Sequence, residues 1–184
     1  TDLVHSSPDL EVREMMAEMQ EVVDTWEGGL RASGGALVPS KSYWYLIHFM
    51  FKNNKWSYAS IEDTPGNLSI RDKSGTNRIT LDRLEVHQAR ETLGVFIAMD
   101  GNHKVQTAEL LKNAHRLADR IRPGRLSHIE TWFSLNSCIM KTLEYPLMAT
   151  SLSMGQCDSI MKPILDVALP ALGINPHLTR HVVY

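Results

Sequence analysis

Cysteine is scarce in this chain, and so is net charge. The 184 residues include two cysteines, Cys138 and Cys157, and neither belongs to a CxxC pair. This scarcity argues against a disulfide framework and against a cysteine-rich zinc site. Both cysteines fall in apolar helical patterns, which predicts buried free thiols. The formal net charge of −2 argues against strong electrostatic binding of the whole chain to nucleic acid or to a membrane surface.

Long hydrophobic runs are also missing. No apolar stretch reaches membrane-spanning length, and no secretory signal peptide is visible. We therefore expect an intracellular protein, nuclear or cytoplasmic, in a reducing compartment and without a membrane partner. The apolar fraction of 43% predicts a buried core. The chain begins at Thr1 and ends in "HVVY", which leads us to expect that both ends were cut from something longer.

The short motifs of self-contained catalytic sites are missing as well. The eight histidines form no HExxH or other metal-ligand spacing, and GxSxG, P-loop and GxGxxG motifs do not occur. Asp2, Asp9 and Asp24 form no recognisable carboxylate pair. The chain's own residues therefore give no positive sign of an autonomous catalytic site.

The N-terminal part reads as one long acidic helix. Ser7-Pro8-Asp9 has the residue types of a helix start, and apolar residues recur at helical spacing from Val12 to Leu30. Residues 1–31 carry eight acids against two bases. The methionines on the apolar stripe are interpreted as core packing.

Antiparallel hairpins are predicted next. Aromatic residues at 42–51 and 56–58 flank a turn at Asn53-Asn54, and a second hairpin flanks "DKSGTN". A short apolar strand over 92–99 ends at Asp100-Gly101. The aromatic hairpin is compatible with base stacking, although core packing under a sheet is the preferred interpretation.

Helical periodicity dominates the remainder. It predicts helices over residues 103–121, over residues 127–143, and from a capping box at Ser153 and Gln156 toward Leu172. Pro163 should kink or split the third helix. The predicted fold class is α+β, with a helix and antiparallel hairpins over residues 1–101 and an all-α bundle over residues 102–184.

One predicted helix carries a basic face. The bases of this region are Lys104, Lys112, Arg116, Arg120, Arg122 and Arg125, against two acids. Lys112, Arg116 and Arg120 are spaced i, i+4 and i+8, which places them on one face. A solvated surface and a line of phosphate contacts are equally weighted interpretations of this face.

Three further motifs follow one another along the chain. "GGALVPSKSYW" resembles the loop-and-strand motif near the end of the reverse transcriptase palm, with Lys41 and Ser42 at the lysine and hydroxyl positions. "TLGVFIAMDG" resembles the next motif, the primer grip, with Leu93-Gly94 at its core. "ETWFSLNSCIMKTLEYPL" resembles a thumb helix that ends in a tyrosine at an apolar turn.

Nearly the whole chain is thus similar to the C-terminal palm and thumb of reverse transcriptases from non-LTR-like retroelements. The resemblance implies a fragment of an RNA-directed DNA polymerase, a nucleotidyltransferase of a retrotransposon, that is inactive alone. The metal-binding aspartates would lie upstream of Thr1, with Asp2 as a neighbour of the site. The resemblance also implies Mg²⁺ in the full-length enzyme and none bound by this fragment. The implied partners are an RNA or DNA primer–template duplex and a dNTP.

The resemblance also implies roles for named residues. Lys41 would donate a proton or neutralise charge near the leaving pyrophosphate. Leu93-Gly94 would form the turn that holds the primer end. The bases of 103–125 would contact phosphates along the template–primer minor groove without reading bases. The alternatives are a non-catalytic nucleic-acid-binding module and a protein-interaction module with methionine-rich and aromatic surfaces.

Overall fold

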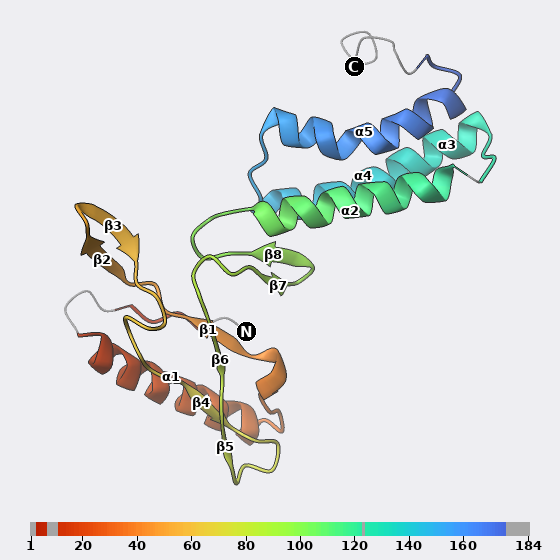
Figure 1. Ribbon diagram of the computed structural model, residues 1–184. Coiled ribbons are helices and arrows are strands. Elements are labelled where there is room, and N and C mark those ends of the chain that lie inside the picture. Colours follow the sequence, from red (N-terminus) through yellow and green to blue (C-terminus); the bar gives the residue numbers. More distant parts are fainter. Residues whose placement is uncertain (1–2, 7–10, 123, 176–184) are drawn as a thin grey trace. The chain divides into compact units, whose positions relative to one another are not determined.

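The chain forms two compact units, Thr1–Gln88 and Ala89–Tyr184. They are seen in a computed structural model that describes residues 3–6, 11–122 and 124–175 (Figure 1). The sequence predicts a boundary after residue 101, whereas the structure divides after Gln88. The reason is that the hairpin over residues 90–97 packs with the helix that follows it rather than with the earlier strands.

The predicted acidic helix is α1 (Val12–Ala32). Glu11 is its N-cap, and the predicted start at Ser7-Pro8-Asp9 lies outside the described residues. One face of α1 packs on the core of the first unit, whose buried members are Val23, Trp44, Leu46, Leu68, Ile70 and Leu81. The methionines of α1 pack against this cluster, which confirms their interpretation as core residues.

Within its described residues, the first unit contains three strand pairs. β2 (Phe49–Lys52) pairs antiparallel with β3 (Lys55–Tyr58), and β4 (Ser69–Arg71) pairs antiparallel with β5 (Arg78–Thr80). Both predicted hairpins are therefore confirmed. β1 (Tyr43–Tyr45) pairs parallel with β6 (Asp82–Leu84), which corrects the prediction of antiparallel pairing alone.

The aromatic run over 42–51 is two strands rather than one. β1 leaves the run to join β6, with Tyr43 opposite Asp82, and β2 begins four residues after the end of β1. A parallel pair needs a long crossover connection, and the two hairpins together supply it.

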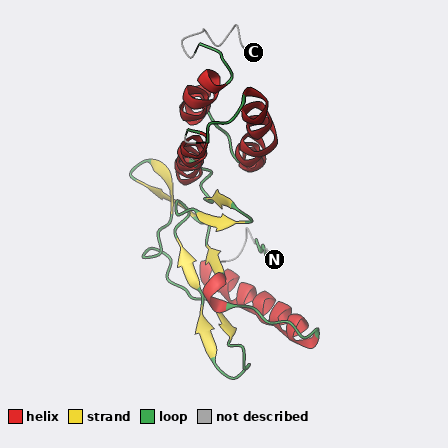
Figure 2. Cartoon of the chain, turned by 90° about the vertical axis from the view of Figure 1, so that its right-hand side faces the viewer, coloured by secondary structure: helices red, strands yellow, loops and turns green. Residues whose placement is uncertain are grey.

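The second unit begins with a hairpin of β7 (Arg90–Thr92) and β8 (Val95–Ile97). The single strand predicted over 92–99 is thus wrong, because a turn at Leu93-Gly94 divides it. The first helix of the unit is α2 (Lys104–Ile121), as the periodicity predicts. Figures 1 and 2 show α2 beside the later helical segments.

The helix predicted over 127–143 is a continuous run of two α-helical segments with a π-helical turn between them. They are α3 (His128–Ser134), a π-helical turn η2 (Leu135–Ile139) and α4 (Met140–Glu144), followed by a 3₁₀ turn η3 (Tyr145–Ala149). Ser127 and Glu130 form a capping box at its start. Pro146 lies within η3 and is buried.

The last helix, α5 (Met154–Ala171), begins at the predicted capping box of Ser153 and Gln156. It runs uninterrupted through Pro163, so the predicted split is wrong. Its buried face packs into the core of the bundle, and that burial outweighs the backbone hydrogen bond that proline cannot donate. The core residues of the bundle are Leu110, Ala114, Ile121, Ile139, Leu143, Ile160 and Ile164.

The structure confirms the mixed α+β class, with small two-stranded sheets and a helical bundle. Burial of the thiols is not confirmed, because Cys138 is exposed and Cys157 is half-buried. Across residues 3–6, 11–122 and 124–175, none of the helices combines the length and the apolar character needed to cross a bilayer.

Candidate nucleic-acid interface

The turn of the β7–β8 hairpin is strained and apolar. Leu93 and Gly94 have φ values of 51° and 82°, so both lie in the left-handed region, as a two-residue type I′ turn requires. Glycine adopts this conformation freely, whereas leucine is held there at a cost of roughly 1 kcal/mol. The Leu93 side chain is 87% exposed. The strained backbone at Leu93 therefore does not serve to bury the side chain within the unit. This makes the tip of the turn a candidate contact surface.

The turn is anchored to the helices on two sides. The hydroxyl of Tyr145 donates a hydrogen bond to the carbonyl oxygen of Leu93 at 2.8 Å. On strand β8, the backbone N–H of Phe96 donates to Oε1 of Gln106 at 2.7 Å, and Gln106 is buried within α2. Because both partners belong to the helical bundle, the bundle determines the position of the turn.

Helix α2 buries one face and exposes its basic residues. Its inward face comprises Gln106, Leu110, Ala114, Ala118 and Ile121. Lys104, Lys112, Arg116 and Arg120 are all exposed. The predicted basic face therefore points to solvent.

Not every base on α2 is available to a ligand to the same degree. Lys112 pairs with Glu109 at 3.2 Å, and Arg122 pairs with Asp119 at 3.3 Å. Such exposed pairs are weak and exchange readily with another anion. Arg116 and Arg120 have no ion pair with any residue that the structure describes. These two arginines are therefore the strongest candidates for phosphate contacts.

The last two predicted bases lie in a different setting. Arg122 and Arg125 border a shallow cavity of about 300 Å³ between the end of α2 and helix α5, where Asp166 also contributes to the wall. A carboxylate in that wall makes the cavity a poorer anion site than the face of Arg116 and Arg120.

Lys41 belongs to the first unit and lies at the end of a 3₁₀ turn, η1 (Pro39–Lys41). Its backbone N–H donates to the carbonyl oxygen of Val38, and the Ser42 hydroxyl donates to the same oxygen at 2.9 Å. These bonds fix the backbone just before β1, while the Lys41 side chain stays exposed. The lysine is thus presented to solvent from a well-defined turn.

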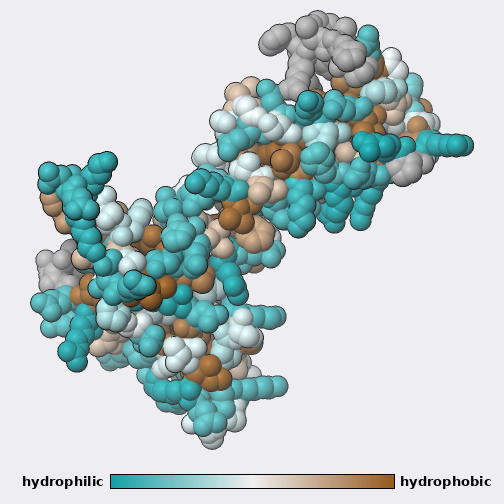
Figure 3. All heavy atoms as spheres, viewed as in Figure 1, coloured by the Kyte–Doolittle hydropathy of each residue, from teal (hydrophilic) through white to brown (hydrophobic). Residues whose placement is uncertain are grey.

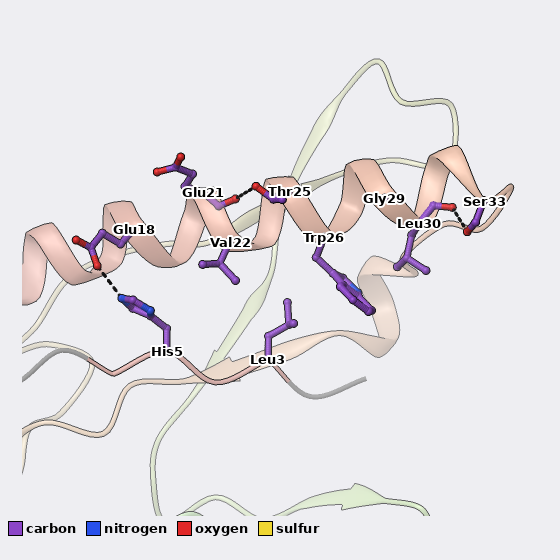
Figure 4. A pocket seen from close by; sticks show the side chains of 10 residues that line it. All are labelled: Leu3, His5, Glu18, Glu21, Val22, Thr25, Trp26, Gly29, Leu30 and Ser33. Atoms are coloured by element: carbon purple, nitrogen blue, oxygen red, sulfur yellow. Dashed lines mark hydrogen bonds and ion pairs between the residues drawn. The ribbon is translucent and has the colours of Figure 1, made fainter.

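A cavity that the sequence did not predict lies along α1 (Figure 4). Its volume is about 780 Å³, and its walls come from Leu3, His5, Ser33 and one side of α1. Figure 4 shows Leu3 and Trp26 at the cavity, while His5 and Glu18 are joined by a contact of 2.8 Å. Within the described ranges, three or more His, Cys, Asp or Glu side chains nowhere come together as a metal site.

The aromatic hairpin differs from its preferred interpretation. Phe49, Phe51, Trp56 and Tyr58 are all exposed, so core packing beneath a sheet is wrong for them. Their period-two alternation was visible in the sequence. That alternation identifies one face of the hairpin but does not say whether a second layer covers it.

Comparisons of the chain with protein-family models, with curated proteins and with solved structures found no match. The geometry of the chain itself therefore defines the candidate interface. It consists of an exposed turn tip anchored to a helical bundle, and the first helix of that bundle exposes two arginines that form no ion pair with a described residue.

Proposed function

We propose that this chain is the C-terminal palm-and-thumb part of an RNA-directed DNA polymerase, and that it positions the primer–template duplex for nucleotidyl transfer. The observation that supports the proposal best is the anchored turn at Leu93-Gly94, followed directly by the exposed arginines of α2. This order matches the primer-grip and thumb motifs that the sequence resembles.

In this proposal the tip of the hairpin contacts the end of the primer. Gly94 has no Cβ, which lets its backbone approach a sugar or base closely. The exposed Leu93 side chain supplies apolar contact with the same nucleotide. Arg116 and Arg120 contact backbone phosphates and thereby set the register of the duplex without reading its sequence.

Lys41 has a proposed role in chemistry rather than in duplex binding. Charge develops on the leaving pyrophosphate, and an exposed ammonium group beside it can donate a proton or neutralise that charge. In the protein that includes the upstream aspartates, Lys41→Ala should lower turnover more than primer binding. Turnover at the parent level would contradict this role.

The resemblance assigns Mg²⁺ to aspartates upstream of Thr1, and among the described residues no three His, Cys, Asp or Glu side chains come together as a metal site. Bound there, the metal ions would stabilise the attacking and leaving oxygens. The coding sequence before Thr1 tests this directly. A Tyr or Phe, a small residue and two aspartates support the polymerase, whereas their absence favours a non-catalytic module.

Duplex binding is tested with charge reversal. We expect Arg116→Glu combined with Arg120→Glu to weaken primer–template binding by about tenfold or more, measured by fluorescence anisotropy. The slope of log affinity against log salt should fall by about two, because two phosphate contacts are lost. Lys141→Glu with Lys162→Glu is the matched control, because it changes the net charge by the same amount on other helical segments.

Equal losses in the two double variants would mean that net charge, rather than the α2 face, governs binding. A parent-like salt slope in the α2 variant would also contradict the proposal.

A further inference from the structure

The β2–β3 hairpin carries an aromatic face, defined by Phe49, Phe51, Trp56 and Tyr58. Phe49 lies opposite Tyr58 and Phe51 lies opposite Trp56 in the strand register. The ring centroids are 4.8 Å apart in the first pair and 5.3 Å apart in the second. Because residues two apart in a strand share a side, all four rings lie on the same face of the hairpin.

This aromatic face is exposed rather than covered. The exposed fractions are 52% for Phe49, 58% for Phe51, 71% for Trp56 and 38% for Tyr58. None of the four belongs to the core cluster of the first unit. A two-stranded hairpin is marginally stable in water by itself, so the cross-strand ring pairs are its main support. They also hold the rings in place before any ligand arrives.

The stretch of chain that contains the aromatic face carries bases and no acids. No Asp or Glu occurs between Glu27 and Glu62, whereas the same stretch contains Arg31, Lys41, Lys52 and Lys55. The tip, residues 52–55, reads Lys-Asn-Asn-Lys and is exposed throughout. Figure 3 shows hydrophilic atoms gathered at this end of the hairpin.

One nearby acid reduces this positive charge in part. Lys52 Nζ lies 2.5 Å from a carboxylate oxygen of Asp63. That hydrogen bond, with those from Ser60, lowers the pKa of Asp63 to about 2, so the carboxylate is ionised at neutral pH. Lys55, opposite Lys52 in the register, has no ion pair within the described part of the chain. The available positive charge at the tip therefore belongs to Lys55.

We propose that the aromatic face binds single-stranded nucleic acid. Bases stack on the exposed rings, and Lys55 contacts a backbone phosphate beside them. Flat π-faces next to a cation are the combination that such sites use, and stacking tolerates any sequence. The site goes beyond duplex binding by the second unit and does not depend on it. A protein partner is less well matched, because this face carries rings without aliphatic side chains between them.

The test uses the whole chain and labelled oligonucleotides of about 12 nucleotides, one of uridine and one of thymidine. Fluorescence anisotropy should show binding of either or both, and comparison of the two separates RNA from DNA. Loss of one stacked base predicts that Trp56→Ala weakens binding by between about 5-fold and about 150-fold. The matched control is Trp132→Ala, since Trp132 is also exposed, at 59%, but lies on α3.

Two further variants separate stacking from a folding defect. Trp56→Phe retains a ring, so it should bind more tightly than Trp56→Ala while losing most of the tryptophan quenching caused by a stacked base. Lys55→Glu should weaken binding and lower the salt slope. Arg116→Glu with Arg120→Glu should leave single-strand binding within about twofold of the parent, which separates this site from the duplex interface.

Several results would overturn the proposal. These are no binding by the parent chain, equal losses in Trp56→Ala and Trp132→Ala, or loss of binding only in the α2 variant. A further contradicting result could come from light scattering, which measures the oligomeric state. A parent dimer that Trp56→Ala converts to a monomer, without oligonucleotide binding, would assign the aromatic face to a second copy of the chain.

Discussion

The hydroxyl of Tyr145 donates a hydrogen bond to the carbonyl oxygen of Leu93 across 2.8 Å, although 52 residues separate the two in sequence. Tyr145 begins the 3₁₀ turn after α4, and Leu93 occupies the strained turn between β7 and β8. A ring carbon of Tyr145 also lies 3.7 Å from the position that a Cβ on Gly94 would take. The end of a helical segment thus holds the hairpin tip that the proposal places at the primer.

Removing this hydroxyl should affect binding more than folding. Tyr145→Phe loses one exposed hydrogen bond, so the free energy of unfolding should fall by at most about 1 kcal/mol. Primer–template affinity should fall severalfold, because the turn loses its anchor. Tyr45→Phe is the matched control, since Tyr45 donates a similar bond to the carbonyl oxygen of Gln88 at 2.9 Å. Equal affinity in the two variants would contradict the anchoring role.

The left-handed backbone at position 93 is unfavourable for leucine. Replacing Leu93 should therefore make the protein more stable and weaken its binding to primer–template. The first hairpin has the same two-residue geometry at Asn53-Asn54, with φ values of 51° and 59°, and asparagine tolerates this region well. Leu93→Asn should therefore raise the free energy of unfolding by up to about 1 kcal/mol. It should weaken primer–template binding, because the exposed apolar contact is lost. Denaturant titration and anisotropy measure the two effects. Unchanged affinity would show that the Leu93 side chain does not contact nucleic acid.

Local chemistry explains what the sequence could predict. The Asn53-Asn54 turn, the capping box of Ser153 and Gln156, and the apolar period of α2 all depend on residues near one another in the chain. Each of these patterns predicts its own turn or helix, whatever the rest of the chain does. The basic face of α2 follows from the same periodicity, because a helix with one buried face must expose the other.

What the sequence missed depends on distant partners. The parallel pairing of Tyr43 with Asp82 joins residues far apart in the chain, and no local pattern specifies it. The exposure of Trp56 depends on whether another layer covers the hairpin, which alternation cannot show. The pairing of Lys112 with Glu109 was readable at i, i+3, and it leaves Lys104, Arg116 and Arg120 as the bases of α2 without an ion pair among the described residues.

A buried carboxylate joins α1 to the second hairpin and should dominate the stability of the first unit. Glu27 is 2% exposed, and its two oxygens each accept a bond from the backbone N–H of Arg71 at 3.1 Å. The Arg31 guanidinium donates to Glu27 at 3.0 and 3.1 Å. Glu27→Ala should lower the free energy of unfolding by about 3 kcal/mol, the lower end for a buried pair because Arg31 is partly exposed. Glu21→Ala, at an exposed site on α1, should change it by about 0.5 kcal/mol or less. Similar denaturation midpoints for the two variants would contradict the assignment.

The bond between Lys52 and Asp63 predicts a pH dependence for the aromatic hairpin. Hydrogen bonds from Lys52 and Ser60 lower the pKa of Asp63 from 3.8 to about 2. A depressed carboxylate pKa stabilises the folded state above pH 3.8, and that contribution is lost as the pH falls toward 2. Carboxyl chemical shifts of Asp63 should titrate near 2 in the parent and at a higher pH in Lys52→Ala, where only the hydrogen bonds from Ser60 remain. If the pKa of Asp63 is the same in the parent and in Lys52→Ala, the hydrogen bond between the two residues is not formed in solution.

Thr131 carries a hydroxyl that the bundle core does not use. The residue is fully buried in α3, and within the described part of the chain its Oγ1 has no hydrogen-bond partner. A buried hydroxyl without a partner costs about 1–3 kcal/mol, and valine has nearly the same shape without that group. Thr131→Val should therefore raise the free energy of unfolding by about 1 kcal/mol, as measured by denaturant titration.

Thr131→Ser is the control variant, because it keeps the hydroxyl and loses a methyl group. It should lower the free energy of unfolding by about 1 kcal/mol. Primer–template affinity should stay at the parent level in both, because neither change reaches the hairpin tip or the exposed face of α2. A destabilised valine variant would mean that a partner, such as a buried water molecule, satisfies the hydroxyl.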